Sequence, residues 1–115
     1  MGMKIAYVVG PLRNESSKKQ RHNIKEAREV ALKLWKAGFA VICPHLNSGK
    51  FDGLVDDKQL LAGSRLIMQQ CELVVTFGDW GCSNGSVDEL ALAGAIGIPI
   101  YHDAREAIHD HLNRI

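Results

Sequence analysis

Four short apolar runs, each followed by a segment with helical periodicity, are the feature that most constrains how this chain can fold. The runs lie at Ile5–Val9, 39–43, 73–77 and 99–101, and β-branched residues are frequent in them. Strands that alternate with helices in one small chain form βαβ units, whose crossovers are right-handed and whose strands are parallel. The sequence therefore predicts an α/β fold with a four- to five-stranded parallel sheet covered by helices on both faces.

The segments between these runs carry signals for helix starts and ends. Asn23-x-x-Glu26 has the spacing of a capping box, and Gly38 is placed to end the same helix. With 115 residues and no visible linker or repeat, the chain is expected to form a single domain, 1–115. Its type is a small doubly wound, Rossmann-like or flavodoxin-like three-layer sandwich. The other expected elements are a loop at 45–55, a helix opened by Asp56 or Asp57, and helices at 87–96 and Ala104–Asn113.

Charge and hydropathy exclude several classes of partner. The 14 basic and 13 acidic residues are interspersed and leave a net charge of +1, so no electrostatic footprint for nucleic acid or an anionic membrane is present. Residues 1–4 lead directly into an apolar strand rather than a signal peptide, and no apolar stretch approaches the length of a membrane span. We expect a cytoplasmic protein with neither nucleic-acid nor membrane partners.

Metal and redox chemistry is also disfavoured. The cysteines are three in number, widely spaced and without a C-x-x-C pair, so they are expected to be reduced thiols rather than a disulfide framework or a zinc site. His109 and His111 are two apart on a helix and do not share a face. Only Gly10 stands after the first strand and G-x-G-x-x-G is absent, which argues against a nicotinamide cofactor. No cofactor and no metal are predicted.

The segment from 73 to 93 has the layout of a site. An apolar strand is followed by a loop of small and polar residues and then by a helix. Asn84, Gly85 and Ser86 can present backbone N–H groups at the positive end of that helix, where an anion is favoured, and Glu89 lies about one turn further on. The structural alternative is that Ser86-x-x-Glu89 is only a capping box. The position of this loop at the carboxyl edge of a parallel sheet, where ligands bind in open α/β folds, favours a functional role.

Other candidates are expected to meet at the same edge. Arg13 can bind a phosphate bidentately or remain a solvated loop residue. Tyr7 is a packed core tyrosine or a substrate contact, and its hydroxyl needs a partner if it is buried. Trp80 can stack on a base or a sugar, or cover the end of the sheet. Further candidates in these loops are Gly10, Asp79 and Ser83.

Several of these segments together resemble a known family, the nucleoside 2-deoxyribosyltransferases and the related deoxynucleoside 5′-monophosphate N-glycosidases. The likeness is greatest to a small phage and bacterial branch with the hallmark W-x-x-S-x-G-[AS]-x-x-E, which is found here from Trp80 to Glu89. The resemblance covers the chain from about Lys4 to Tyr101. The segments that carry it lie at 7–13, 38–44, 71–75, 80–93 and 97–100.

The resemblance implies roles for individual residues. Glu89 matches the family's catalytic glutamate, a nucleophile that attacks the anomeric carbon and holds a glycosyl-enzyme intermediate. Gly85-Ser86-x-x-Glu89 is also similar to the G-T-x-x-E core of the cytokinin-activating phosphoribohydrolases, which likewise cleave a base from a nucleotide. Gly10, Arg13, Ser83 and Ser86 fall where relatives bind the sugar or the 5′-phosphate.

One departure from the family leaves two functions open. Ser64 stands where the relatives carry an aspartate on the helix before the third strand, and a serine cannot replace a carboxylate as a proton shuttle near neutral pH. The acid then comes from elsewhere, with Asp56, Asp57 and Asp79 as the candidates, or the domain binds a nucleotide without hydrolysing it. The leading hypothesis is a nucleoside or nucleoside 5′-monophosphate N-glycosidase or deoxyribosyltransferase. The alternative is a non-catalytic sensor that binds a nucleotide or an ADP-ribose-like ligand.

A homo-oligomer is also expected, because so short a chain forms a shallow crevice and ligand pockets normally bury most of their ligand. A neighbouring subunit of a homodimer, or of a higher oligomer, would close the site. The apolar residues expected at the interface are Leu60, Leu61, Met68 and Leu92.

Overall fold

A four-stranded parallel sheet forms the centre of the computed structural model, which describes residues 2–11, 16–47, 51 and 53–113. The strands lie in the order β2-β1-β3-β4, so the chain changes direction across the sheet between β1 and β3. This sheet and its helices confirm the predicted α/β three-layer fold. The strands are β1 (Ile5–Val9), β2 (Ala40–Ile42), β3 (Leu73–Thr76) and β4 (Ile100–Tyr101).

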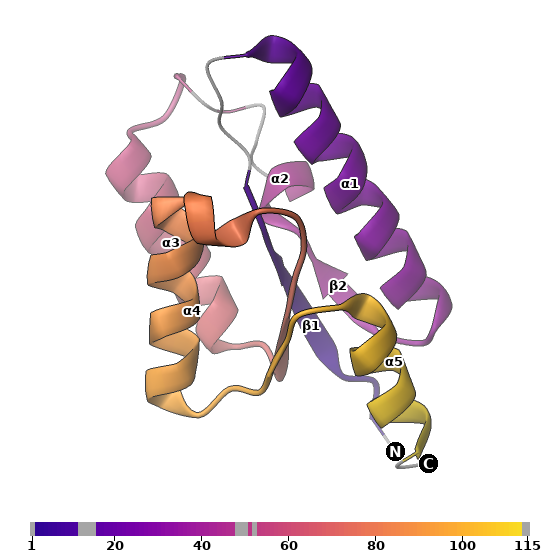
Figure 1. Ribbon diagram of the computed structural model, residues 1–115. Coiled ribbons are helices and arrows are strands. Elements are labelled where there is room, and N and C mark those ends of the chain that lie inside the picture. The colour runs from indigo at the N-terminus through magenta and orange to yellow at the C-terminus, as the bar shows by residue number, and fades with distance from the viewer. Residues whose placement is uncertain (1, 12–15, 48–50, 52, 114–115) are drawn as a thin grey trace.

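The helices form two layers, one on each side of the sheet (Figure 1). Helices α1 (Ser17–Lys36) and α5 (Ala104–Asn113) cover one face, and α3 (Asp57–Gln69) and α4 (Asn84–Ile96) cover the other. Because side chains alternate along a strand, Ala6 and Val8 pack under α1 while Tyr7 and Val9 pack under α3 and α4. Two short elements complete the fold, α2 (Pro44–Asn47) and the 3₁₀ turn η2 (Trp80–Cys82).

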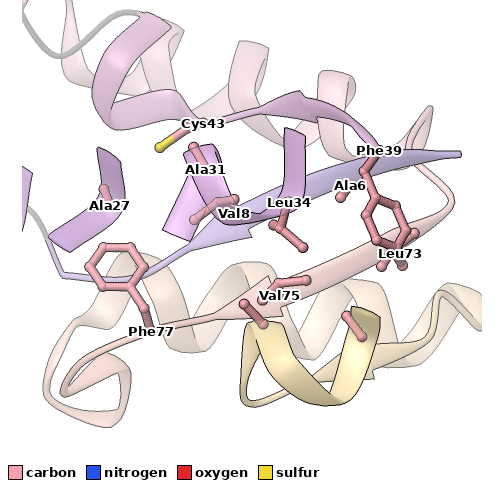
Figure 2. Packing of buried hydrophobic residues seen from close by; sticks show 12 residues of the cluster. Ala6, Val8, Ala27, Ala31, Leu34, Phe39, Cys43, Leu73, Val75 and Phe77 are labelled. Atoms are coloured by element: carbon pink, nitrogen blue, oxygen red, sulfur yellow. The ribbon is translucent and has the colours of Figure 1, made fainter. Parts of the chain in front are cut away.

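The core on the α1 and α5 side is shown in Figure 2, where small residues of α1 let the helix approach the strands closely. Phe77 extends this core beyond the end of β3. A Cβ atom at Gly10 would lie 2.2 Å from Cε1 of the Phe77 ring, so the chain leaving β1 passes the ring at a distance that only glycine permits. This contact sets the path of the backbone at Gly10, where the chain leaves the carboxyl end of β1.

Helix α1 begins earlier than the capping-box pattern predicts. Ser16 is the N-cap residue and its hydroxyl accepts a hydrogen bond from the Lys19 amide at 3.3 Å, whereas Asn23 is buried inside the helix. Residues 17–22 are exposed or half-buried, so they carry no apolar periodicity that could reveal the helix. At the other end, Gly38 adopts the expected positive φ of 102°.

The remaining elements follow the predicted order with small shifts. Asp56 caps α3 by accepting from the Lys58 amide at 3.3 Å, as predicted. Part of the expected loop at 45–55 is helical, because α2 begins directly after β2. The predicted helix at 87–96 begins three residues earlier, at Asn84. None of the helices in the described ranges has both the length and the apolar character needed to cross a membrane.

Candidate functional site

A hydrogen bond between β1 and α4 defines the candidate site. Tyr7 lies in the central strand with none of its surface exposed, and its hydroxyl donates to Glu89 Oε2 at 2.5 Å. Burial, reinforced by the negative charge of Glu89, raises the pKa of Tyr7 far above its ordinary value, so the phenol keeps its proton at any pH the fold tolerates. Tyr7 is therefore a permanent donor to the carboxyl group.

The carboxyl group of Glu89 is under opposing influences. Burial raises its pKa, while the hydrogen bond from Tyr7 and the positive charge of Arg65 lower it, and burial has the largest effect. A carboxylate that has lost most of its water and keeps one strong donor is basic and nucleophilic for its type. This environment is typical of a functional carboxylate rather than of one that only contributes to packing.

Helix α3 supplies the neighbours of this pair. A hydrogen bond from Ser64 to Tyr7 partly offsets the rise in the tyrosine pKa, so the Ser64 hydroxyl lies at the same site. Arg65 Nη2 is 3.6 Å from Asp88 Oδ2, and its buried Nε has no hydrogen-bond partner among the described residues. Ser64 thus lies beside the tyrosine that holds Glu89.

The start of α4 differs from the expected capping box. Ser83 is the N-cap residue, and its hydroxyl accepts from the Ser86 amide at 3.3 Å. Glu89 lies in the second helical turn and bonds Tyr7 instead of the helix start. Ser86 is buried and its N–H is already used, so an anion at this helix start would meet the N–H groups of Asn84 and Gly85.

Trp80 contacts both His102, the residue that follows β4, and the cluster that contains Tyr7. It packs against the apolar cluster that contains Tyr7, and its indole stacks on the imidazole of His102 with centroids 5.2 Å apart and planes inclined by 16°. Thr76 Oγ1, almost fully buried, is 3.1 Å from His102 Nδ1. The structure therefore gives Trp80 a stacking partner within the chain and holds His102 at two points.

The other predicted residues have mixed outcomes. Gly10 ends β1 against Phe77, and Asp79 is exposed before η2 without a side-chain capping bond. Arg13 lies outside the described residues. All three thiols are free, and within the described part of the chain no group of three metal-ligating side chains comes together.

Sequence reasoning did not select Arg65 or His102 for the site. Arg65 directly follows Ser64, so the same comparison that singled out the serine could have pointed to it. The sequence places His102 at a strand end beside the predicted crevice, but the interpretation it favoured was a hydrogen-bonded loop histidine. Its contact with Thr76 depends on strand register, which the sequence does not reveal.

Among known proteins, the chain is similar to solved structures rather than to known sequences. No protein-family model matches the chain, and no curated protein matches it by sequence. One similar solved structure is a 2-deoxyribosyltransferase from the psychrotolerant bacterium Bacillus psychrosaccharolyticus, with a TM-score of 0.59 and 20% identity over 84% of this chain and 69% of that chain. The fold is nucleoside deoxyribosyltransferase-like.

In this deoxyribosyltransferase-like fold the Tyr7–Glu89 pair lies between the sheet and the α3 and α4 layer. Tyr7 comes from β1, one of the two strands between which the chain reverses direction across the sheet. Ligands of open α/β sheets bind outside the carboxyl ends of the strands at such a switch point. The buried carboxylate therefore lies next to the place where this class of fold receives its ligand.

Proposed function

We propose that this chain cleaves or transfers the N-glycosidic bond of a nucleoside or nucleoside 5′-monophosphate, with Glu89 as the nucleophile. The observation that carries the proposal is the hydrogen bond from the buried Tyr7 hydroxyl to Glu89 Oε2. A glutamate that only capped its helix would bond backbone N–H groups, whereas this one is held on the sheet side of α4. The similarity to a 2-deoxyribosyltransferase agrees with this chemistry.

The proposed reaction uses the two carboxyl oxygens differently. Tyr7 holds Oε2, which leaves Oε1 to attack the anomeric carbon as the bond to the base breaks. The positive charge of Arg65 favours the ionised carboxylate before attack. Water or a second base then displaces the sugar from Glu89, which gives hydrolysis or transfer.

A second candidate function is binding without catalysis, and Ser64 is the observation that favours it. Ser64 occupies the position of the family's aspartate and bonds Tyr7. A serine hydroxyl is far too weak an acid to give up its proton near neutral pH, so it cannot replace a carboxyl group in acid catalysis. A chain of this kind would bind a nucleotide or an ADP-ribose-like ligand beside Glu89 and leave it intact.

The experiment that separates the two is base release from a panel of nucleosides and their 5′-monophosphates, measured by chromatography. Wild-type protein is expected to release base from at least one of them, and Glu89→Gln is expected to lose roughly 1,000-fold or more in rate. Glu106→Gln is the matched control, because it makes the same change at an exposed glutamate of α5, on the opposite face of the sheet. This control is expected to keep most of the activity.

Two results would contradict the enzymatic proposal. Equal turnover by the wild type and Glu89→Gln would exclude Glu89 as the nucleophile. A rise in Tm with a nucleotide, without any base release by the wild type, would favour the binding function instead.

A further inference from the structure

A second titratable side chain, that of His102, is positioned at the carboxyl edge of the sheet on the same side as Glu89. Resting on the function proposed above, we propose that His102 is the proton donor to the leaving base and supplies the acid that Ser64 cannot. The inference stands on strand register, on two contacts that orient the imidazole, and on the surroundings of the other titratable groups at this edge.

Strand register places His102 on the side of the sheet that carries Glu89. Val74 pairs with Ile100 and Val75 with Tyr101, so the next pair along the two strands is Thr76 with His102, as their 3.1 Å contact bears out. Because side chains alternate, Thr76 and His102 face the same layer as Val74, which packs with Tyr7. The imidazole is thus on the α3 and α4 side.

Two contacts fix the ring in one orientation. The buried Thr76 hydroxyl holds Nδ1, and the indole of Trp80 lies flat against one face of the imidazole. Trp80 in turn packs against the cluster that includes Tyr7, which links His102 to the residue that holds Glu89. Nε2 has no hydrogen-bond partner in the part of the chain that is described, and His102 is exposed. Nε2 is therefore the nitrogen that can meet a ligand.

Other titratable groups near this edge are less suited to the role. His45 packs against Phe77 on the opposite face of the sheet, its Nε2 is 2.8 Å from the Pro11 carbonyl oxygen, and burial lowers its pKa, which favours the neutral ring. Asp103 is tied to Arg105 by an ion pair of 2.9 Å. Asp79 is exposed, and its side chain makes no capping bond to η2. An imidazole is the side chain best matched to proton transfer near neutral pH.

The proposed steps balance as follows. A carboxylate oxygen of Glu89 forms a bond to the anomeric carbon while the carbon–nitrogen bond breaks. The electron pair of that bond goes to the base, which takes a proton from Nε2 of the protonated His102 and leaves as the neutral base. In the second step a water molecule attacks the anomeric carbon and gives its proton to Nε2. This step releases the sugar, regenerates the Glu89 carboxylate and reprotonates His102.

The test compares two leaving groups in the His102→Phe variant, in which a flat ring still stacks on Trp80. The first substrate is a purine deoxynucleoside and the second is 4-nitrophenyl 2-deoxyriboside, whose phenolate leaves without a proton. Single-turnover measurements isolate the first step from the later attack by water, which is common to both substrates. In them we expect release of the base from the nucleoside to slow by about 100-fold or more and release of 4-nitrophenolate to stay near the wild-type rate. His109→Phe, an exposed histidine of α5, is the control and should cleave both substrates normally.

The pH profile provides a second readout. In the wild type, kcat/KM for the nucleoside is expected to fall at high pH as the proton donor is lost. This fall should be absent in His102→Phe, because no imidazole then has to be protonated. Asp103 and Arg105, which follow His102 in the chain, form an ion pair of 2.9 Å that lowers the pKa of Asp103 and raises that of Arg105, so the expected fall belongs to neither.

The outcomes distinguish this inference from the function on which it rests. Equal losses on both substrates, or no loss on either, would overturn the assignment of His102 while leaving Glu89 in place. Cleavage of the aryl substrate by Glu89→Gln at the wild-type rate would overturn the proposed nucleophile. Failure of the wild type to cleave either substrate would overturn the proposed function and the role of His102 with it.

Discussion

Glu89 is a buried acid whose position costs stability at neutral pH. Its pKa in the fold is raised above the ordinary value of 4.5, mainly by burial, so ionising it costs more free energy in the folded chain than in the unfolded chain. The corresponding contribution to stability is fully present below pH 4.5 and is lost as the pH rises through the raised pKa. A glutamine at this position keeps an acceptor for Tyr7 without a charge, so the Glu89→Gln protein should be at least as stable as the wild type at pH 7.

Removing the donor to Glu89 should change the pH dependence of the reaction. In Tyr7→Phe the carboxylate loses a hydrogen bond that lowers its pKa, so the acidic limb of kcat/KM should move to higher pH. Leaving a buried carboxylate without this donor should also cost about 1–3 kcal/mol of stability at pH 7, and less at a pH where Glu89 is protonated. Activity profiles and denaturant unfolding at two pH values measure both effects.

The matched control for this variant is Tyr101→Phe. The Tyr101 hydroxyl donates to Asp110 of α5, on the opposite face of the sheet, so its removal should lower stability without moving the acidic limb. The idea that Tyr7 tunes Glu89 would be wrong if both variants shifted the limb equally, or if neither did.

For single residues, the sequence predicts which side chains lie at the site more reliably than it predicts their hydrogen-bond partners. Tyr7 was expected either in the core or at the substrate, and its ring lies in the core while its hydroxyl bonds Glu89. The capping-box reading of Ser86 was wrong because Ser83, Asn84 and Ser86 are all good cap residues, and packing of Ser86 into the interior decides among them.

Helix α4 is the element on which the site depends, and its start is set by one hydroxyl. Ser83 satisfies the Ser86 amide, and the Ser83 carbonyl accepts the amide of Val87. Ser83→Ala should therefore cost about 1 kcal/mol of unfolding free energy and loosen the first turn. Asn84→Ala, one residue later and exposed, removes no cap and is the control. Thermal unfolding of the two variants checks the difference, and equal Tm values would rule out the capping role.

Element order was predictable because each strand is a short apolar run bounded by Gly or Pro. The ends of the helices were not predictable in the same way. Helix α1 extends from Lys36 back to Ser17, and its first turns lie beyond the apolar face that packs on the sheet. A polar helical turn has no periodic signature, so only the cap at Ser16 marks it. The turn η2 has the same character, since Gly81 and Cys82 are exposed and follow no apolar pattern.

On the surface of the molecule, the layer formed by α3 and α4 exposes several apolar side chains. Met68, expected at a subunit interface, is fully buried in the chain's own core and cannot serve there. Leu61, also expected there, is 42% exposed and lies 3.9 Å from the position a Cβ of Gly85 would take, next to the start of α4. Leu66 and Val87 add exposed apolar surface on the same two helices. We propose that this layer, with Leu61 among the contacting residues, joins two copies.

Light scattering at micromolar concentration tests this arrangement. A homodimer has twice the 12.7 kDa mass of one chain. Leu61→Asp should shift the mass toward the monomer, because a desolvated carboxylate opposes association. Leu112→Asp, at a similarly exposed leucine on α5, should remain dimeric. A wild-type mass that stays monomeric as concentration and nucleotide are raised would contradict the proposal.

The distance in sequence between the two partners of the central hydrogen bond bears on how the protein matures. Tyr7 and Glu89 are 82 positions apart, and the pairing of β1 with β3 that aligns them is also non-local. Contacts of such long range are slow to form, since the entropy of closing a large loop is lost before they contribute. During synthesis or refolding, the chain therefore gains helices long before it gains a site. Catalytic competence would accordingly be among the last properties to appear, and its recovery would time the docking of α4 onto the completed sheet.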